Sequence, residues 1–282
     1  MNAASPLTAD LASGKGHRDE NFPVASRLVA KRHRAPIMAF YRFARAADDI
    51  ADHAQAPPET KLARLGAMRA TLLGETDADA PALALREVTQ AHALDPIHAL
   101  DLLRAFTRDV TQSRYASWED LLDYCRYSAM PVGRFVLDVH GESHALWPAS
   151  DALCTALQIV NHLQDCGKDY RALDRVYLPQ DMLAAHAART EDLGAAQATA
   201  ALRATIAAAA IATENILARS AGFARSIRSL GLGLEVAVIQ RLAVDLAARL
   251  KTRDPLADRV HHGKAEALAL ALPALLKRLV GR

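Results

Sequence analysis

The stretch that decides the fold is residues 41–52, which read YRFARAADDIAD. At about 100° per residue, Tyr41, Arg45, Asp48 and Asp52 fall within roughly a 60° arc of one helix face. The apolar side chains beside this stripe predict a largely buried helix; they are Phe40, Phe43, Ala47 and Ile50.

Two carboxylates on that face need an explanation. Asp48 and Asp52 are like charges one turn apart, which by itself opposes helix formation by a few tenths of a kcal/mol. They also lie late in the helix, where the macrodipole disfavours carboxylates. Buried carboxylates without a counter-charge are costly, and a divalent cation is a simple remedy. For this run alone, a solvated acidic patch is an equally good interpretation.

A second helix repeats the pattern in the sequence QIVNHLQDCGKD, which starts at Gln158. Asn161, Asp165 and Asp169 are spaced i, i+4 and i+8, and Lys168 lies near the same stripe. Their ligand atoms are carboxylate and amide oxygens, the hard donors that suit Mg²⁺. Because Mg²⁺ is usually held by a few carboxylates together with substrate phosphates, the two acidic faces predict a clamp for metal ions that bridge a diphosphate.

The composition limits the classes of protein. Of 282 residues, 51% are hydrophobic and only 5% are aromatic, and alanine makes up about a fifth. Alanine is the best helix former, so this balance excludes an all-β protein. The formal net charge of +2 gives no bulk argument for nucleic-acid binding. Three cysteines, Cys125, Cys154 and Cys166, are too few for a disulfide framework and favour a reducing cytoplasm.

No membrane-targeting segment is expected. The first eighteen residues lack the apolar core of a signal peptide, and no run of about 18 uncharged apolar residues occurs. We expect the most apolar run, residues 204–212, to be a buried helix. We predict a flexible tail over residues 1–18 and a single all-α domain over residues 19–282. Helices are expected at residues 23–32, 34–53, 60–73, 82–93, 97–109, 118–140, 150–170, 180–188, 194–220, 234–251 and 263–280.

A third segment, starting at Tyr124, reads YCRYSAMPVG. It places small residues and Pro131 inside an expected helix, where proline costs about 3 kcal/mol and kinks the axis. Two interpretations stay open. The small residues leave room for a ligand, or they allow tight helix packing at Ala129 and Gly133.

These motifs resemble those of the squalene/phytoene synthase family. The resemblance runs from about residue 19 to residue 270, and it rests on five segments: residues 20–26, the Asp48–Asp52 motif, residues 128–133, residues 161–169 and residues 174–179. The sequences NFPVAS at 21–26 and NHLQDC at 161–166 are most similar to those of one branch, the bacterial hydroxysqualene synthases of hopanoid biosynthesis.

The resemblance implies a trans-prenyltransferase-like, isoprenoid-synthase-type helical bundle around a central apolar cavity, with the two aspartate faces on opposite sides. It implies that Mg²⁺ is bound by Asp48, Asp52, Asn161, Asp165 and Asp169. The implied catalytic residues are Tyr41, Arg45 and Tyr124. The implied substrate-binding residues are Phe22, Arg45, Ser128, Val132, Gln158, Asn161 and Arg175. Arg259 and Lys264 lie where the family often supplies further basic contacts. Pro131 and Gln164 depart from the family pattern.

The implied activity is that of an enzyme that converts presqualene diphosphate into hydroxysqualene by ionisation, carbocation rearrangement and water capture. Presqualene diphosphate synthases and phytoene synthases, which condense two prenyl diphosphates, keep the same aspartates and remain alternatives, as does a reductive enzyme using a nicotinamide. Family members that became assembly or binding proteins lose the aspartates, which this chain retains. A zinc site at His140 and His144 lacks a third ligand.

The expected partner is an isoprenoid diphosphate substrate and not a nucleic acid. We also expect peripheral contact with the inner face of the membrane for release of the lipid product, and functional coupling to other hopanoid-pathway enzymes. A basic run of Arg27, Lys31, Arg32 and Arg34 is either a solvated face or a contact for anionic lipid.

Overall fold

The structure is a computed structural model that describes residues 28–280. Within this range the chain is helical and forms no strand, with one isolated bridge between Arg114 and Val176. The prediction of an all-α fold is confirmed. The predicted tail, Phe22 and most of the helix expected at 23–32 lie outside the described residues. The chain divides into two compact units, and the single domain expected over residues 19–282 stays a prediction.

The first unit, residues 31–112, contains four helices, in which α1 and α2 each pack against both α3 and α4. Sequence signals set the ends of these helices. Gly74 ends α2 in the left-handed conformation (φ 82°), and the side chain of Asp79 accepts a hydrogen bond from Ala82 N at the start of α3. The helices are α1 (Lys31–Asp52), α2 (Pro58–Leu73), α3 (Ala80–Ala91) and α4 (Ile97–Thr111).

The second unit, residues 28–30 with 113–280, begins with α5 (Trp118–Ser128) and α6 (Met130–Val139). The single helix expected over residues 118–140 is wrong, because the backbone breaks at Ala129 (φ −121°, ψ −50°). Pro131 lies in the first turn of α6, where its missing N–H leaves no helix hydrogen bond unmade.

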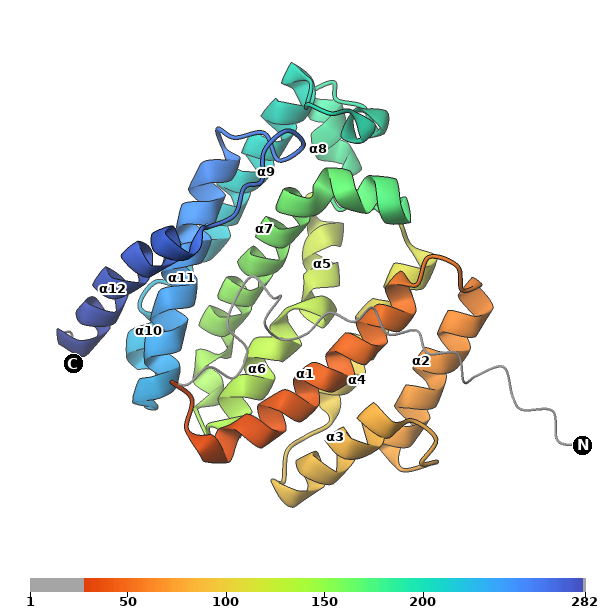
Figure 1. Ribbon diagram of the computed structural model, residues 1–282, viewed down its shortest axis with the longest axis vertical. Helices are drawn as coiled ribbons and strands as arrows, with labels where there is room; N and C mark the ends of the chain where they lie inside the picture. The colour runs from red at the N-terminus through yellow and green to blue at the C-terminus, as the bar shows by residue number, and fades with distance from the viewer. Residues whose placement is uncertain (1–27, 281–282) are drawn as a thin grey trace, which may run out of the picture. The chain divides into compact units, whose positions relative to one another are not determined.

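The rest of the second unit is built around α7, which packs against α5, α6, α9 and α11. The helix expected at residues 194–220 begins at Ala200, where the Thr199 side chain accepts from Leu202 N, because residues 190–194 form a separate 3₁₀ turn. In Figure 1, α12 runs beside α11, and the two helices are in contact. The helices are α7 (Trp147–Leu173), α8 (Gln180–Ala185), α9 (Ala200–Ala218), α10 (Phe223–Ser226), α11 (Leu230–Leu250) and α12 (Lys264–Val280).

One stretch among the described residues, Ala200–Ser226, is long and apolar enough to cross a membrane by length and composition alone. Its helix, α9, packs against α7, α8 and α11 and buries Leu202, Ile206 and Ala210. These contacts are those of a core helix, as expected for residues 204–212.

Candidate active site

The first acidic face lies on α1. Its apolar neighbours Phe40, Phe43, Ala47 and Ile50 are buried, as the helical period predicted, while Tyr41, Arg45, Asp48 and Asp52 are part-buried. This face belongs to the first unit, whereas the second acidic face, on α7, belongs to the second.

Arg45 forms ion pairs with two carboxylates of its own helix. Its Nη1 lies 2.9 Å from Asp48 Oδ2, and its Nη2 lies 2.6 Å from Asp49 Oδ1. Asp49, whose side chain is only 10% exposed, is not among the site residues predicted from the sequence. Its i,i+4 spacing from Arg45 was the available signal.

Negative charge exceeds positive charge around Asp48. Burial is the largest cause that raises the pKa of Asp48 to about 7, followed by the charge of Asp52, while Arg45 acts in the opposite direction. Asp109 of α4 and Asp49 add smaller contributions that also raise the pKa. A carboxylate in such surroundings gains when a divalent cation binds nearby, so the residues of this face fit a Mg²⁺ ion.

The second acidic face lies in the middle and carboxyl-terminal half of α7. Asn161, Asp165 and Asp169 are part-buried, with Ile159, Val160 and Leu163 buried beside them. Asp165 Oδ2 lies 3.5 Å from Lys168 Nζ, whose side chain is 61% exposed. A pairing of two exposed groups at that distance contributes little, so Asp165 remains available to a stronger cation.

The chain after α7 turns back toward residues 113–115. Asp174 ends α7 in the left-handed region (φ 49°), and its carboxylate accepts from Arg114 Nη2 at 2.6 Å. Val176 N then donates to Ser113 O at 2.9 Å. This connection brings Tyr177 beside Tyr115, 62 positions earlier in the sequence, with ring centroids 5.5 Å apart.

A cluster of aromatic rings forms at this junction. Tyr124 of α5 lies 5.2 Å from Tyr115 and 5.6 Å from Tyr177, measured between ring centroids. The ring of His162 stacks on Tyr177 at 3.4 Å. Burial lowers the pKa of His162 to about 3, and the charge of Arg175 acts in the same direction, so the imidazole is neutral at ordinary pH.

Three predicted site residues meet around this cluster, which the sequence analysis did not identify as a unit. Tyr124 is a member, Gln158 Nε2 lies 3.0 Å from His162 Nε2, and the buried Arg175 donates from Nη1 to Tyr177 Oη at 3.3 Å. The roles assigned to these residues stay predictions.

The α5–α6 segment carries the two remaining predicted contacts. Ser128 Oγ is buried and has no hydrogen-bond partner within residues 28–280, which leaves a polar atom for a ligand. Val132 is 41% exposed on α6. At Gly133 an added Cβ would lie 2.3 Å from Ser150 Oγ and 2.6 Å from Cys154 Sγ, so tight helix packing explains this glycine.

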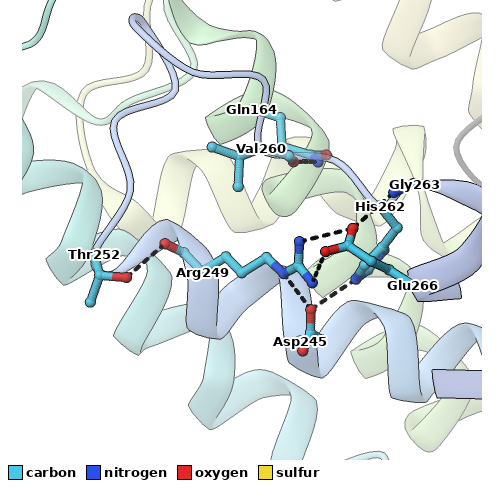
Figure 2. A network of polar contacts seen from close by, with 8 residues as sticks. All are labelled: Gln164, Asp245, Arg249, Thr252, Val260, His262, Gly263 and Glu266. Atoms are coloured by element: carbon cyan, nitrogen blue, oxygen red, sulfur yellow. Dashed lines mark hydrogen bonds and ion pairs between the residues drawn. The ribbon is translucent and has the colours of Figure 1, made fainter. Parts of the chain in front are cut away.

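Gln164 ties α7 to the loop between α11 and α12 (Figure 2). It is 6% exposed, and its Nε2 donates to Val260 O. The same loop is held by His262, whose Nε2 lies 2.9 Å from Asp245 Oδ2. Asp245 also accepts from Arg249 Nε at 2.5 Å. Gln164 therefore helps to fix the loop that carries Arg259 and leads into α12 at Lys264.

The two histidines considered for zinc have other partners. His144 lies 3.2 Å from Asp138 and stacks on Trp147 at 4.3 Å, and His140 Nδ1 lies 2.8 Å from Val136 O. Across residues 28–280, no three or more His, Cys, Asp or Glu side chains gather closely enough to hold a metal ion.

Known proteins are similar to this chain both in sequence and in fold. The family model described as squalene/phytoene synthase matches residues 16–266. The hydroxysqualene synthase of Zymomonas mobilis is 55% identical over 99% of this chain and 93% of its own length. That of Rhodopseudomonas palustris is 51% identical over 97% of this chain and 94% of its own length.

Solved structures share the architecture. The squalene synthase HpnC from Alicyclobacillus acidocaldarius is 32% identical and superimposes with a TM-score of 0.71, covering 81% of this chain and 86% of the other. A dehydrosqualene synthase solved with a ligand superimposes with a TM-score of 0.80 at 20% identity, covering 94% and 93%. The second likeness concerns the fold alone.

Proposed function

The chain belongs to the squalene/phytoene synthase family of prenyl diphosphate-processing enzymes, and we propose that it converts presqualene diphosphate and water into hydroxysqualene and diphosphate. The observation that carries this proposal is similarity over nearly the whole chain to hydroxysqualene synthases. In the reaction the carbon–oxygen bond to diphosphate breaks, a bond to water oxygen forms, and one proton is released.

The acidic faces are the proposed metal sites. Asp48 and Asp52 of α1, and Asn161, Asp165 and Asp169 of α7, would hold Mg²⁺. Bound there, Mg²⁺ supplies positive charge that stabilises the departing diphosphate. The raised pKa of Asp48 supports this assignment, because a carboxylate that burial and the charge of Asp52 both destabilise gains when a cation binds beside it.

The arginines and tyrosines have separate proposed roles. Arg45 and Arg175 bind the diphosphate, since a guanidinium donates to phosphate oxygens in a bidentate manner. Tyr41 and Tyr124 present ring faces to the positive charge that develops on carbon. The tilted contacts of Tyr124 with Tyr115 and Tyr177 in a buried aromatic cluster support this role, because neighbouring rings hold it in one orientation and keep water away.

Substrate contacts complete the proposal. Ser128 offers a hydroxyl without a hydrogen-bond partner in the described part of the chain, and Gln158 offers an amide held by His162. Phe22 and Val132 are the proposed apolar contacts. Water capture at the end of the reaction requires only that one water reach the rearranged cation.

We place the enzyme in the cytoplasm at the inner face of the membrane, because the proposed substrate and product carry long hydrocarbon chains. Functional coupling to other hopanoid-pathway enzymes belongs to the same proposal. Fractionation of cells that make the full chain tests the location. The enzyme is expected partly in the membrane fraction and released from it by high salt.

Product analysis tests the reaction. The purified full chain is incubated with Mg²⁺ and either presqualene diphosphate or farnesyl diphosphate, each with and without a nicotinamide cofactor, and the lipids are identified by mass spectrometry. Hydroxysqualene from presqualene diphosphate without nicotinamide is expected. Condensation of farnesyl diphosphate as the principal reaction contradicts the proposal and favours a synthase that joins two prenyl diphosphates.

A further inference from the structure

The last helix exposes a continuous apolar face. Its exposed fractions are 61% at Leu268, 52% at Leu272, 61% at Leu276, 48% at Leu279 and 84% at Val280. Spacings of three and four residues place these side chains on one side of α12, along about 18 Å of helix. The other side packs against α11 (Figure 1). Isolated exposed leucines are ordinary, but an apolar stripe over three turns marks an interaction surface.

The carboxyl end of α12 is fixed to a basic part of the same unit. Arg278 is buried and donates from Nε to Ala224 O at 2.8 Å and from Nη2 to Ile227 O at 3.0 Å. These bonds hold the end of α12 against α10, whose Arg225 is exposed. Lys277 is exposed on α12 itself.

The exposed charged side chains near this end of α12 are positive. Residues 267–280 and residues 219–234 contain no Asp or Glu, yet they contain four Arg or Lys residues besides Arg228. Arg228 is compensated, since its Nε lies 3.5 Å from the buried carboxylate of Glu142. A leucine-rich stripe that ends in uncompensated positive charge is complementary to a bilayer surface with anionic headgroups.

We propose that the exposed face of α12, with Arg225 and Lys277 at its end, is the surface by which the protein binds an anionic phospholipid bilayer. This surface would make the membrane contact of the proposed function, whichever diphosphate the enzyme uses. The leucines enter the boundary between headgroups and acyl chains, while the basic end contacts lipid phosphate. A second copy of the chain is the competing occupant, and the experiment distinguishes it.

Flotation of the full chain with vesicles tests the surface. The vesicles are phosphatidylcholine alone or phosphatidylcholine with 30 mol% phosphatidylglycerol. The test variant is Leu272→Glu/Leu276→Glu, whose side chains are exposed. The matched control, Ile97→Glu/Ile211→Glu, replaces two residues that are 43% and 51% exposed on other helices. A charge variant, Arg225→Gln/Lys277→Gln, is compared with Arg69→Gln/Arg253→Gln, which removes two exposed charges elsewhere.

The expected pattern has three parts. The wild type binds the anionic vesicles at least tenfold more tightly than the neutral ones, and 0.5 M NaCl weakens this preference. Leu272→Glu/Leu276→Glu lowers binding to both vesicles at least tenfold, and Arg225→Gln/Lys277→Gln lowers only the anionic preference. The controls bind like the wild type.

Two results overturn the proposal. One is vesicle binding that the α12 variants do not change. The other is a dimer in sedimentation velocity that Leu272→Glu/Leu276→Glu dissociates, which assigns the face to a second copy. All variants are also assayed on detergent-dispersed substrate, where wild-type turnover is expected. Vesicle binding is measured without substrate, so it tests the membrane surface even if the protein does not catalyse the proposed reaction.

Discussion

The guanidinium of Arg45 lies 2.9 Å from the carboxylate of Asp48, one turn away on the same helix. The residue assigned to the diphosphate is thus paired with a residue assigned to the metal. This pair compensates only part of the charge, because Asp49, Asp52 and Asp109 all raise the pKa of Asp48. Uncompensated negative charge therefore remains on this face, and we expect a bound cation to neutralise it.

Asp48→Asn is expected to stabilise the metal-free protein while it abolishes turnover. The pKa of Asp48 rises from 3.8 to about 7 on folding, so the folded chain binds the extra proton between those values. Ionisation of Asp48 therefore lowers the free energy of unfolding. This loss is absent below pH 4, grows as the pH rises, and is complete above pH 7. Since the side chain is 34% exposed, screening limits the gain at pH 8 to about 1 kcal/mol, or about 2–4 °C in Tm.

Calorimetry in EDTA at pH 8 and pH 4 measures this difference. The gain is expected at pH 8 and is expected to vanish at pH 4. Asp77→Asn serves as the control, because Asp77 is 71% exposed on the surface. A destabilised Asp48→Asn at pH 8 contradicts the account.

Mg²⁺ is expected to raise the Tm of the wild type at pH 8 and to have a smaller effect on Asp48→Asn. A cation that binds only the folded chain stabilises it by mass action. Titration of Mg²⁺ from 0 to 10 mM, with substrate absent, measures the shift by calorimetry. Equal shifts in the two proteins argue against a role for Asp48 in binding the metal.

Asp165→Asn is expected to lower kcat at least about 100-fold, because stabilisation of the leaving diphosphate is lost. Helix content and Tm should change little, since Asp165 is part-exposed and its ion pair with Lys168 is weak. Turnover and circular dichroism are measured together. Asp123→Asn, at another part-exposed carboxylate, is the comparison. Wild-type turnover in Asp165→Asn contradicts the proposal that Asp165 of α7 holds Mg²⁺.

Gly133→Ala is expected to destabilise the protein by about 1–3 kcal/mol, because the new Cβ would meet Ser150 and Cys154 in the α6–α7 interface. The matched change is Gly66→Ala in α2, where nothing lies within 4 Å. That variant should be neutral or gain up to about 1 kcal/mol from helix propensity. Urea denaturation measures both. Equal effects at the two sites contradict the packing explanation.

Gln164→Met is expected to cost about 1–2 kcal/mol, since Val260 O loses the hydrogen bond from the Gln164 side chain within the protein interior. Hydrogen exchange should accelerate at residues 259–263 and not at α9. Exchange followed by mass spectrometry provides the measurement. Uniformly faster exchange throughout the second unit would instead indicate that the substitution destabilises the whole unit, and not that Gln164 stabilises this loop locally.

The helical period by itself determined much of this protein. It placed Asp48 and Asp52 on one face of α1, and Asn161, Asp165 and Asp169 on one face of α7, since backbone geometry fixes which residues share a face. The same motifs identified the family. Helix ends were predictable where proline or glycine marked them, and the break at Ala129 was missed because a proline allows either a kink or a new first turn.

The tertiary structure decided which groups meet across long stretches of chain. The Tyr115–Tyr177 stack depends on the pairing of Val176 with Ser113, and the bond from Gln164 to Val260 spans 96 positions. No local pattern encodes such contacts. Periodicity also shows that α12 has an apolar face, but not whether another helix covers it. Its leucines are exposed because α11 packs against the opposite side, and only the packed fold could decide that.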